Sequence, residues 1–198
     1  MRRIHLLAAA GALFTALQPA TAQTPPLALE VRGGYAIPTG DWNEDDTFEN
    51  GLGIGASVMA MVTPQIGVYA GWEMFRFSAN VEEEGVEADA TDSGFRAGIS
   101  FSATVPQYRN VTPFIEAGVL YNSLEISASG DGASVSIESE DALGFEAGVG
   151  FATDISPQLS VVPMIRFRQH EAEFDLEGIE GSDTVQYVVI GVGLRLRL

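Results

Sequence analysis

Hydrophobic residues alternate with small or polar residues along most of the chain. The pattern is clearest near the C-terminus, where every second position is aliphatic: Val188, Ile190, Val192, Leu194, Leu196 and Leu198. The positions between them hold Tyr187, Val189, Gly191, Gly193, Arg195 and Arg197. Successive side chains of a β-strand point to opposite faces, so this period of two predicts a strand. A strand with a purely aliphatic face suits a barrel wall that is surrounded by lipid.

The same alternation predicts eight strands in total, at residues 27–37, 51–62, 66–79, 94–105, 112–127, 142–153, 159–173 and 184–198. One face of each strand is aliphatic or aromatic. The other face carries glycine, alanine and serine, with glutamate or arginine spaced among them. Eight such segments predict an all-β fold, a transmembrane antiparallel up-and-down β-barrel.

The predicted connections alternate between short and long. Three short turns share a proline followed by glutamine, at residues 63–65, 105–107 and 156–158. Proline presets the backbone angle of a tight turn and cannot continue a strand ladder. The other four connections, at 41–50, 81–93, 130–141 and 174–183, are long and acidic. Short turns at one end and long loops at the other are typical of outer-membrane barrels.

Alternation alone leaves two barrel types open, because a soluble lipocalin-like barrel has its apolar face inside. The small residues of the polar face favour a narrow lumen, where space is limited. Its charges have both signs, as a closed lumen requires. We expect this lumen charge network to contain Glu30, Arg32, Glu73, Arg96, Glu116, Glu146, Arg166, Arg168, Arg195 and Arg197. Aromatic residues on the apolar face, among them Trp72, Phe95 and Tyr121, suit a membrane-interface girdle.

The first 22 residues predict a cleaved secretory signal peptide. Arg2 and Arg3 precede an apolar run of about a dozen residues, and Ala20-Thr21-Ala22 forms a cleavage site of small residues. The run is too short for a membrane-spanning helix. We therefore expect residues 1–22 to be removed and residues 23–198 to form one barrel domain.

Composition excludes several functions. The formal net charge is −17 at pH 7, which argues against nucleic acid as a partner. There is no cysteine, so a disulfide, a thiolate nucleophile and a cysteine metal site are all excluded. The acidic loops could offer oxygen ligands to calcium, but they lack a fixed ligand spacing, and a solvated loop is the simpler interpretation. We expect no metal site and no cofactor.

The chain resembles the small outer-membrane β-barrel family of the OmpA/OmpX kind. Its stretch VRGGYAIPTGDWN, from Val31 to Asn43, is similar to that family's first strand and first external loop. The resemblance implies an integral outer-membrane protein of a Gram-negative bacterium, a monomer whose partners are outer-membrane lipid and lipopolysaccharide. It also implies that periplasmic chaperones and the barrel-assembly machinery are partners during biogenesis. The machinery would recognise a C-terminal signal, here Val192, Leu194, Leu196 and Leu198. That family usually ends in an aromatic residue, whereas this chain ends in Leu198.

Three functions remain open at the level of sequence. We expect a non-enzymatic structural or surface-interaction role, with contacts made through the acidic external loops. A narrow channel, or transport of a small hydrophobic solute, is the alternative. A lipid A-modifying enzyme is a weaker one, because His170, flanked by Glu171 and Glu173, has no serine two residues beyond it. We therefore expect no catalytic residue, and a lumen that is a structural plug.

Overall fold

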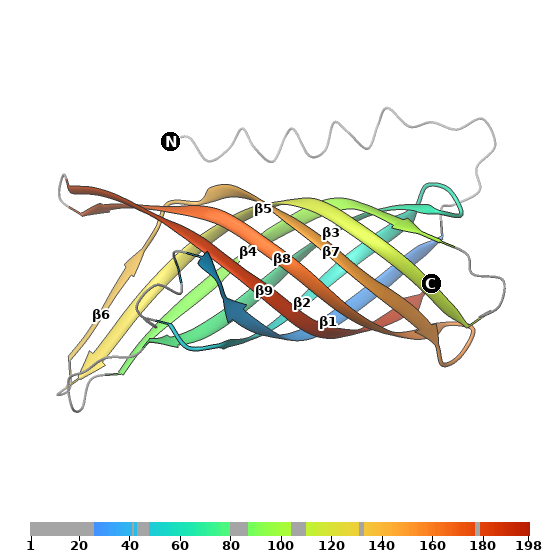
Figure 1. Ribbon diagram of the computed structural model, residues 1–198, viewed down its shortest axis with the longest axis horizontal. Helices are drawn as coiled ribbons and strands as arrows, with labels where there is room; N and C mark the ends of the chain where they lie inside the picture. The colour runs from blue at the N-terminus through green and yellow to red at the C-terminus, as the bar shows by residue number, and fades with distance from the viewer. Residues whose placement is uncertain are drawn as a thin grey trace.

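The computed structural model describes residues 26–40, 42, 48–79, 87–103, 110–130, 133–176 and 179–198 (Figure 1). The signal-peptide prediction for residues 1–22 falls outside this range. The described residues form nine strands: β1 (Leu27–Pro38), β2 (Gly51–Met61), β3 (Ile66–Ala79), β4 (Glu87–Ser102), β5 (Val111–Gly130), β6 (Ala133–Glu138), β7 (Ala142–Asp154), β8 (Leu159–Leu176) and β9 (Ile179–Arg197). No helix among these residues is both long and apolar enough to cross a membrane.

Eight of the strands close into a ring, and all neighbours are antiparallel. The sheet order is β4-β3-β2-β1-β9-β8-β7-β5-β6, and a further pairing of β4 with β5 closes it. β6 lies outside the ring, because it pairs with the far end of β5 alone. The predicted eight-stranded, up-and-down antiparallel barrel is therefore confirmed, with one added short strand.

The barrel has a turn end and a loop end. At the turn end, the Thr63 hydroxyl accepts a hydrogen bond from the backbone N–H of Ile66. The Ser156 hydroxyl accepts one from the backbone N–H of Leu159. These bonds close two of the three Pro-Gln turns, because a hydroxyl three residues earlier replaces a backbone acceptor. The third turn, at residues 105–107, lies outside the described residues.

At the loop end, the described residues of three of the four predicted loops lie largely in strands. β4 begins at Glu87, β6 lies within the predicted loop 130–141, and β8 and β9 continue to Leu176 and from Ile179. The prediction was wrong here because it sought an apolar face suited to lipid. Past their apolar stretches the strands keep their backbone pairing, while their outer faces become polar.

The apolar faces point outward. Leu52, Phe95 and Leu143 are exposed by 69%, 65% and 74%, values that suit contact with lipid tails. A lipocalin-like barrel would bury these side chains in its interior. The apolar residues of the alternating pattern therefore form the outer wall, as predicted.

Two apolar clusters lie inside the barrel, one toward each end. The loop-end apolar cluster consists of Ala36, Trp42, Phe75, Phe77, Ala90, Leu124, Ala172, Val185, Tyr187 and Val189. The turn-end apolar cluster consists of Phe114, Ala152, Val162 and Met164. Sequence alternation assigned most of these positions to a small, polar face. Their aromatic side chains fill the lumen above and below the charged residues.

Candidate functional site

Glycines on the lumen face make room for the large side chains there. Gly98 on β4 and Gly118 on β5 are directly opposite each other. A Cβ atom on either one would lie 2.5 Å from the Tyr69 hydroxyl. Tyr69 therefore crosses two neighbouring strands over bare backbone, and its hydroxyl donates a 2.8 Å hydrogen bond to Glu146 on β7.

Arg96 stands at the centre of the lumen network. Its Nη2 lies 2.5 Å from Glu146 Oε1 and 3.0 Å from Glu116 Oε1. Its Nη1 lies 3.5 Å from Glu73 Oε1. The guanidinium also stacks 4.3 Å from the centre of the Tyr69 ring. One buried cation thus joins carboxylates from β3, β5 and β7.

Two arginines of β8 reach the same carboxylates from the opposite wall. Arg166 Nη1 donates to Glu73 Oε2 over 2.8 Å and to Glu146 Oε2 over 3.2 Å. Arg168 lies farther off, 3.6 Å from Glu73 and 3.8 Å from Glu146. The network therefore spans the lumen, because β3 and β8 lie on different sides of the ring.

The network continues toward the turn end through β1 and β9. Arg32 Nη2 lies 2.5 Å from Glu30 Oε1, and its Nη1 lies 3.4 Å from Glu116 Oε1. Arg195 Nε donates to Glu30 Oε2 over 2.7 Å, although Arg195 keeps 11% of its side chain exposed. Glu30 is thus held between two arginines.

The structure places Arg197 apart from the other predicted lumen charges. Its side chain is 44% exposed, and it pairs with Asp154 at the turn end. It also donates to the Ser160 hydroxyl and to the Pro157 carbonyl. Arg197 therefore closes the rim of the barrel, while the other nine predicted residues meet in the lumen.

Sequence reasoning missed a second buried polar group, at Asp92. Asp92 accepts hydrogen bonds from Asn122 Nδ2, at 2.7 Å, and from the Tyr187 hydroxyl, and His170 Nε2 lies 3.1 Å away. Tyr187 in turn accepts from Arg168 Nη1 at 2.7 Å, which links Asp92 to the lumen network. Asp92 was assigned to an acidic loop, and this was wrong because β4 begins before it. The sequence could have shown this. Asp92 and Arg96 are an even number of residues apart, so in one strand their side chains point to the same, inward face.

Adding Asp92 balances the buried charge. The joined carboxylates are those of Glu30, Glu73, Asp92, Glu116 and Glu146. The joined guanidiniums are those of Arg32, Arg96, Arg166, Arg168 and Arg195. Five of each sign give a formal sum of zero for these ten side chains. A buried charge without a partner is costly, so this balance is what a closed lumen requires.

The arrangement offers no evident nucleophile. His170 is 2% exposed, and its recorded hydrogen-bond partners are Asp92 and the Glu171 carbonyl, with no serine between them. Among the described residues, no group of three or more histidines and carboxylates is placed to hold a metal ion.

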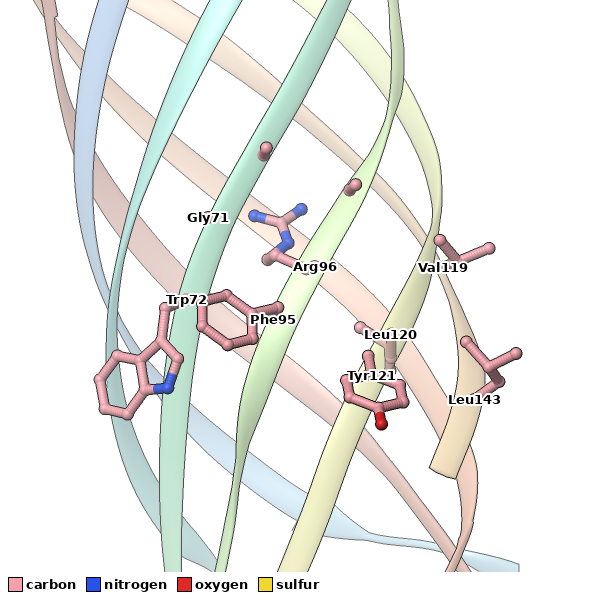
Figure 2. Close-up of a pocket in the computed structure, with 10 residues that line it drawn as sticks. Gly71, Trp72, Phe95, Arg96, Val119, Leu120, Tyr121 and Leu143 are labelled. Carbon is pink, nitrogen blue, oxygen red and sulfur yellow. The ribbon is translucent and has the colours of Figure 1, made fainter. Parts of the chain in front are cut away.

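A shallow groove of about 500 Å³ lies on the outer wall, across β3, β4, β5 and β7 (Figure 2). One row of register partners borders it: Trp72, Phe95, Tyr121 and Leu143. The small side chains of Ala70 and Ala97, which face each other, leave the space open. On the lumen side of this wall Arg96 and Leu120 are buried. The groove is therefore an indentation of the lipid-facing surface.

Solved structures at low sequence identity share this fold. Neisserial surface protein A is 10% identical over 87% of this chain and 97% of its own, with a TM-score of 0.60. Outer membrane protein W of Escherichia coli is 16% identical over 90% of this chain and 100% of its own, with a TM-score of 0.55. The Escherichia coli outer membrane protease OmpT is 8% identical over 90% and 99%, with a TM-score of 0.53. At such identities the likeness establishes the fold alone, and a protease among these structures shows that the fold does not decide catalysis.

Sequence comparison places the chain in a family. No curated protein matches it significantly. The family of the outer membrane protein beta-barrel domain matches over residues 6–197, nearly the whole chain. Together with the closed ring of antiparallel strands and its outward apolar face, this match establishes that the chain belongs to the outer membrane protein beta-barrel domain family.

Proposed function

We propose that this protein is a non-enzymatic outer-membrane barrel with a structural and surface-interaction role. Closure of the lumen is the observation that carries the proposal. Arg96 and Arg166 join Glu73 and Glu146 from opposite walls, and the side chains of all four are at most 2% exposed. An ion crossing this layer would have to break several charge-assisted hydrogen bonds at once.

The loop-end apolar cluster supports the same proposal. Trp42 is 2% exposed and packs edge-on against Phe77, with ring centres 4.6 Å apart. Tyr187 contacts the same ring at 5.2 Å. These aromatic side chains fill the lumen on the loop side of the network, so a polar solute would meet an apolar layer before it reached a charge.

A hydrophobic-solute path through the wall is less well supported. The outer groove is backed by Arg96, whose side chain is held by Glu116 and Glu146. The strands β3 and β4, which border the groove, pair without a break, from Ile66 to Ala79 on β3 and from Phe101 to Ala88 on β4. A lateral opening would have to separate these paired strands.

Charge at the loop end supports a surface role. The described, exposed carboxylates there are Glu49, Glu125, Glu138, Glu140, Asp141, Glu171, Glu173 and Asp183. Arg76 is the one exposed arginine among the described residues of that end, and it pairs with Asp89 at 2.5 Å. In the family's orientation this end faces outward, where the acidic surface would attract cationic partners.

Conductance across a planar bilayer tests the proposal. Purified, heat-modifiable protein should insert without producing stepwise current at moderate voltage. The control is a variant with Arg96→Ala and Arg166→Ala, which opens the centre of the network and should leak if it folds. Stable current steps from the unaltered protein, at the same protein-to-lipid ratio, would favour the channel alternative and overturn the closed-lumen proposal.

A further inference from the structure

β6 leaves one of its edges without a partner strand in the described structure. It pairs with β5 along its whole length, from Glu125 opposite Glu138 to Gly130 opposite Ala133. It is the last strand in the sheet order. Toward β8, the Glu140 N–H donates to the Glu173 carbonyl, and no further pairing with β8 is seen among the described residues. Figure 1 shows β6 running apart from the β8–β9 hairpin.

The register of the β5–β6 hairpin identifies the free backbone groups. The Ser139 N–H donates to the Leu124 carbonyl over 2.8 Å, one step beyond the pair Glu125–Glu138. Hydrogen-bonded and non-hydrogen-bonded pairs alternate along an antiparallel ladder. Glu125–Glu138 is therefore a non-hydrogen-bonded pair, and the N–H and C=O groups of Ser134, Ser136 and Glu138 point to the free edge.

The charge beside this edge is unfavourable in the isolated protein. Glu125 and Glu138 are both exposed and lie directly opposite each other. In a non-hydrogen-bonded pair the two side chains are at their closest, and like charges in this position destabilise a sheet. A cation on a neighbouring strand would relieve the repulsion.

The other face of the same edge is apolar. Val135 is 64% exposed, and Ile137 is partly buried. Ile137 is paired with Ile126, which packs against the loop-end apolar cluster. Val135 and Ile137 therefore extend the apolar interior of the barrel outward along β6. A strand added here would meet carboxylates on one face and aliphatic side chains on the other.

We propose that the free edge of β6 binds an extended polypeptide segment of a partner protein in which basic and apolar residues alternate. Strand addition supplies backbone hydrogen bonds for affinity, while alternate side chains supply selectivity. Basic residues of the segment lie beside Glu138, and its apolar residues cover Val135 and Ile137. This inference rests on the proposed surface role and names its partner class.

A second copy of this chain fits the edge less well. Two β6 edges of two copies would bring two acidic strands together, in a protein whose formal net charge is −17. Repulsion of like charges across an interface disfavours such pairing. The partner is therefore a polypeptide of opposite charge.

The test measures peptide binding to the full chain in nanodiscs of uncharged phosphatidylcholine. The probe is a labelled six-residue peptide of alternating arginine and valine, and its control is a peptide with three arginines followed by three valines. Ser136→Pro removes an edge N–H that the β5 ladder does not use, whereas the matched Ser136→Ala keeps it. Heat-modifiability on a gel verifies that each variant is folded.

The alternating peptide should bind the unaltered protein and Ser136→Ala equally, and Ser136→Pro at least about tenfold more weakly. Glu138→Gln should weaken binding and reduce its dependence on salt. Equal binding of both peptides, or equal binding by the proline and alanine variants, would overturn strand addition. Dimers that Ser136→Pro abolishes would overturn it too, by assigning the edge to a second copy. These outcomes are independent of bilayer conductance, which tests the proposed function.

Discussion

The Tyr69 hydroxyl donates a 2.8 Å hydrogen bond to Glu146 across two intervening strands. The path is open because Gly98 and Gly118 present no side chain beneath the phenol ring. The pair shows how the polar face works in this barrel. Its glycines leave room for the long side chains of the lumen, and its carboxylates accept hydrogen bonds from those side chains.

Gly118→Ala should therefore disturb the network from a position that carries no charge. Its Cβ would lie 2.5 Å from the Tyr69 hydroxyl and 2.6 Å from the Ala97 carbonyl oxygen. We expect a loss of about 1–3 kcal/mol in the free energy of unfolding, the usual cost of overpacking. Urea unfolding in detergent micelles measures it. Gly33→Ala is the matched control, since its Cβ would meet its nearest recorded neighbour at an ordinary 3.7 Å. Equal losses at both positions would contradict the role given to Gly118.

Arg96→Met should be among the most destabilising substitutions in the chain. It removes the cation that joins Glu73, Glu116 and Glu146, and breaking one partner of a buried ion pair costs about 3–5 kcal/mol. Arg76→Met, at an exposed ion pair, should cost less than about 1 kcal/mol. Adding Glu146→Gln to Arg96→Met should recover part of the loss. The same urea unfolding experiment measures all three, and additive losses in the double variant would contradict a shared network.

His170→Ala should leave lipid A unchanged while lowering stability. His170 is buried, and its imidazole lies within hydrogen-bond distance of the Asp92 carboxylate. It therefore positions Asp92 and has no access to a lipid substrate. Mass spectrometry of lipid A from cells that express the variant or the unaltered protein checks the first expectation, and thermal unfolding checks the second. A lipid A species present with His170 and absent with alanine would instead favour the enzymatic alternative.

Arginine substitutions along β5 should locate the membrane. Val119 is 57% exposed on the outer wall, and arginine there should cost about 2–4 kcal/mol, the penalty for a charge near the bilayer midplane. Ser129 is exposed on the same strand and face, ten residues nearer the loop end. Ser129→Arg should be nearly neutral if β5 has left the lipid there. Unfolding free energies in phospholipid vesicles compare the two, and a similar cost at both positions would mean that the lipid extends to the strand's end.

The period-two pattern sufficed to predict the number of strands in the ring, the direction of the apolar face and most of the buried charge. Glu30, Glu73, Glu116 and Glu146 were identified because each shares the parity of its strand's small residues. Parity is a local property, since neighbouring side chains of any strand point to opposite faces. It is therefore readable wherever one face must be apolar to meet lipid.

Tertiary structure decided what parity leaves open. Asp92 was predicted to lie in a loop, but it is a lumen carboxylate because pairing with β3 and β5 continues β4 past its apolar stretch. Phe75, Phe77 and Tyr187 occupy the polar face, and they are buried because strands distant in sequence bring them together inside a closed ring. The free edge of β6 likewise depends on which strands are present beside it. The alternation of neighbouring residues determines which face of a strand points inward. The contacts that this face makes depend on the closure of the ring, which brings distant strands together.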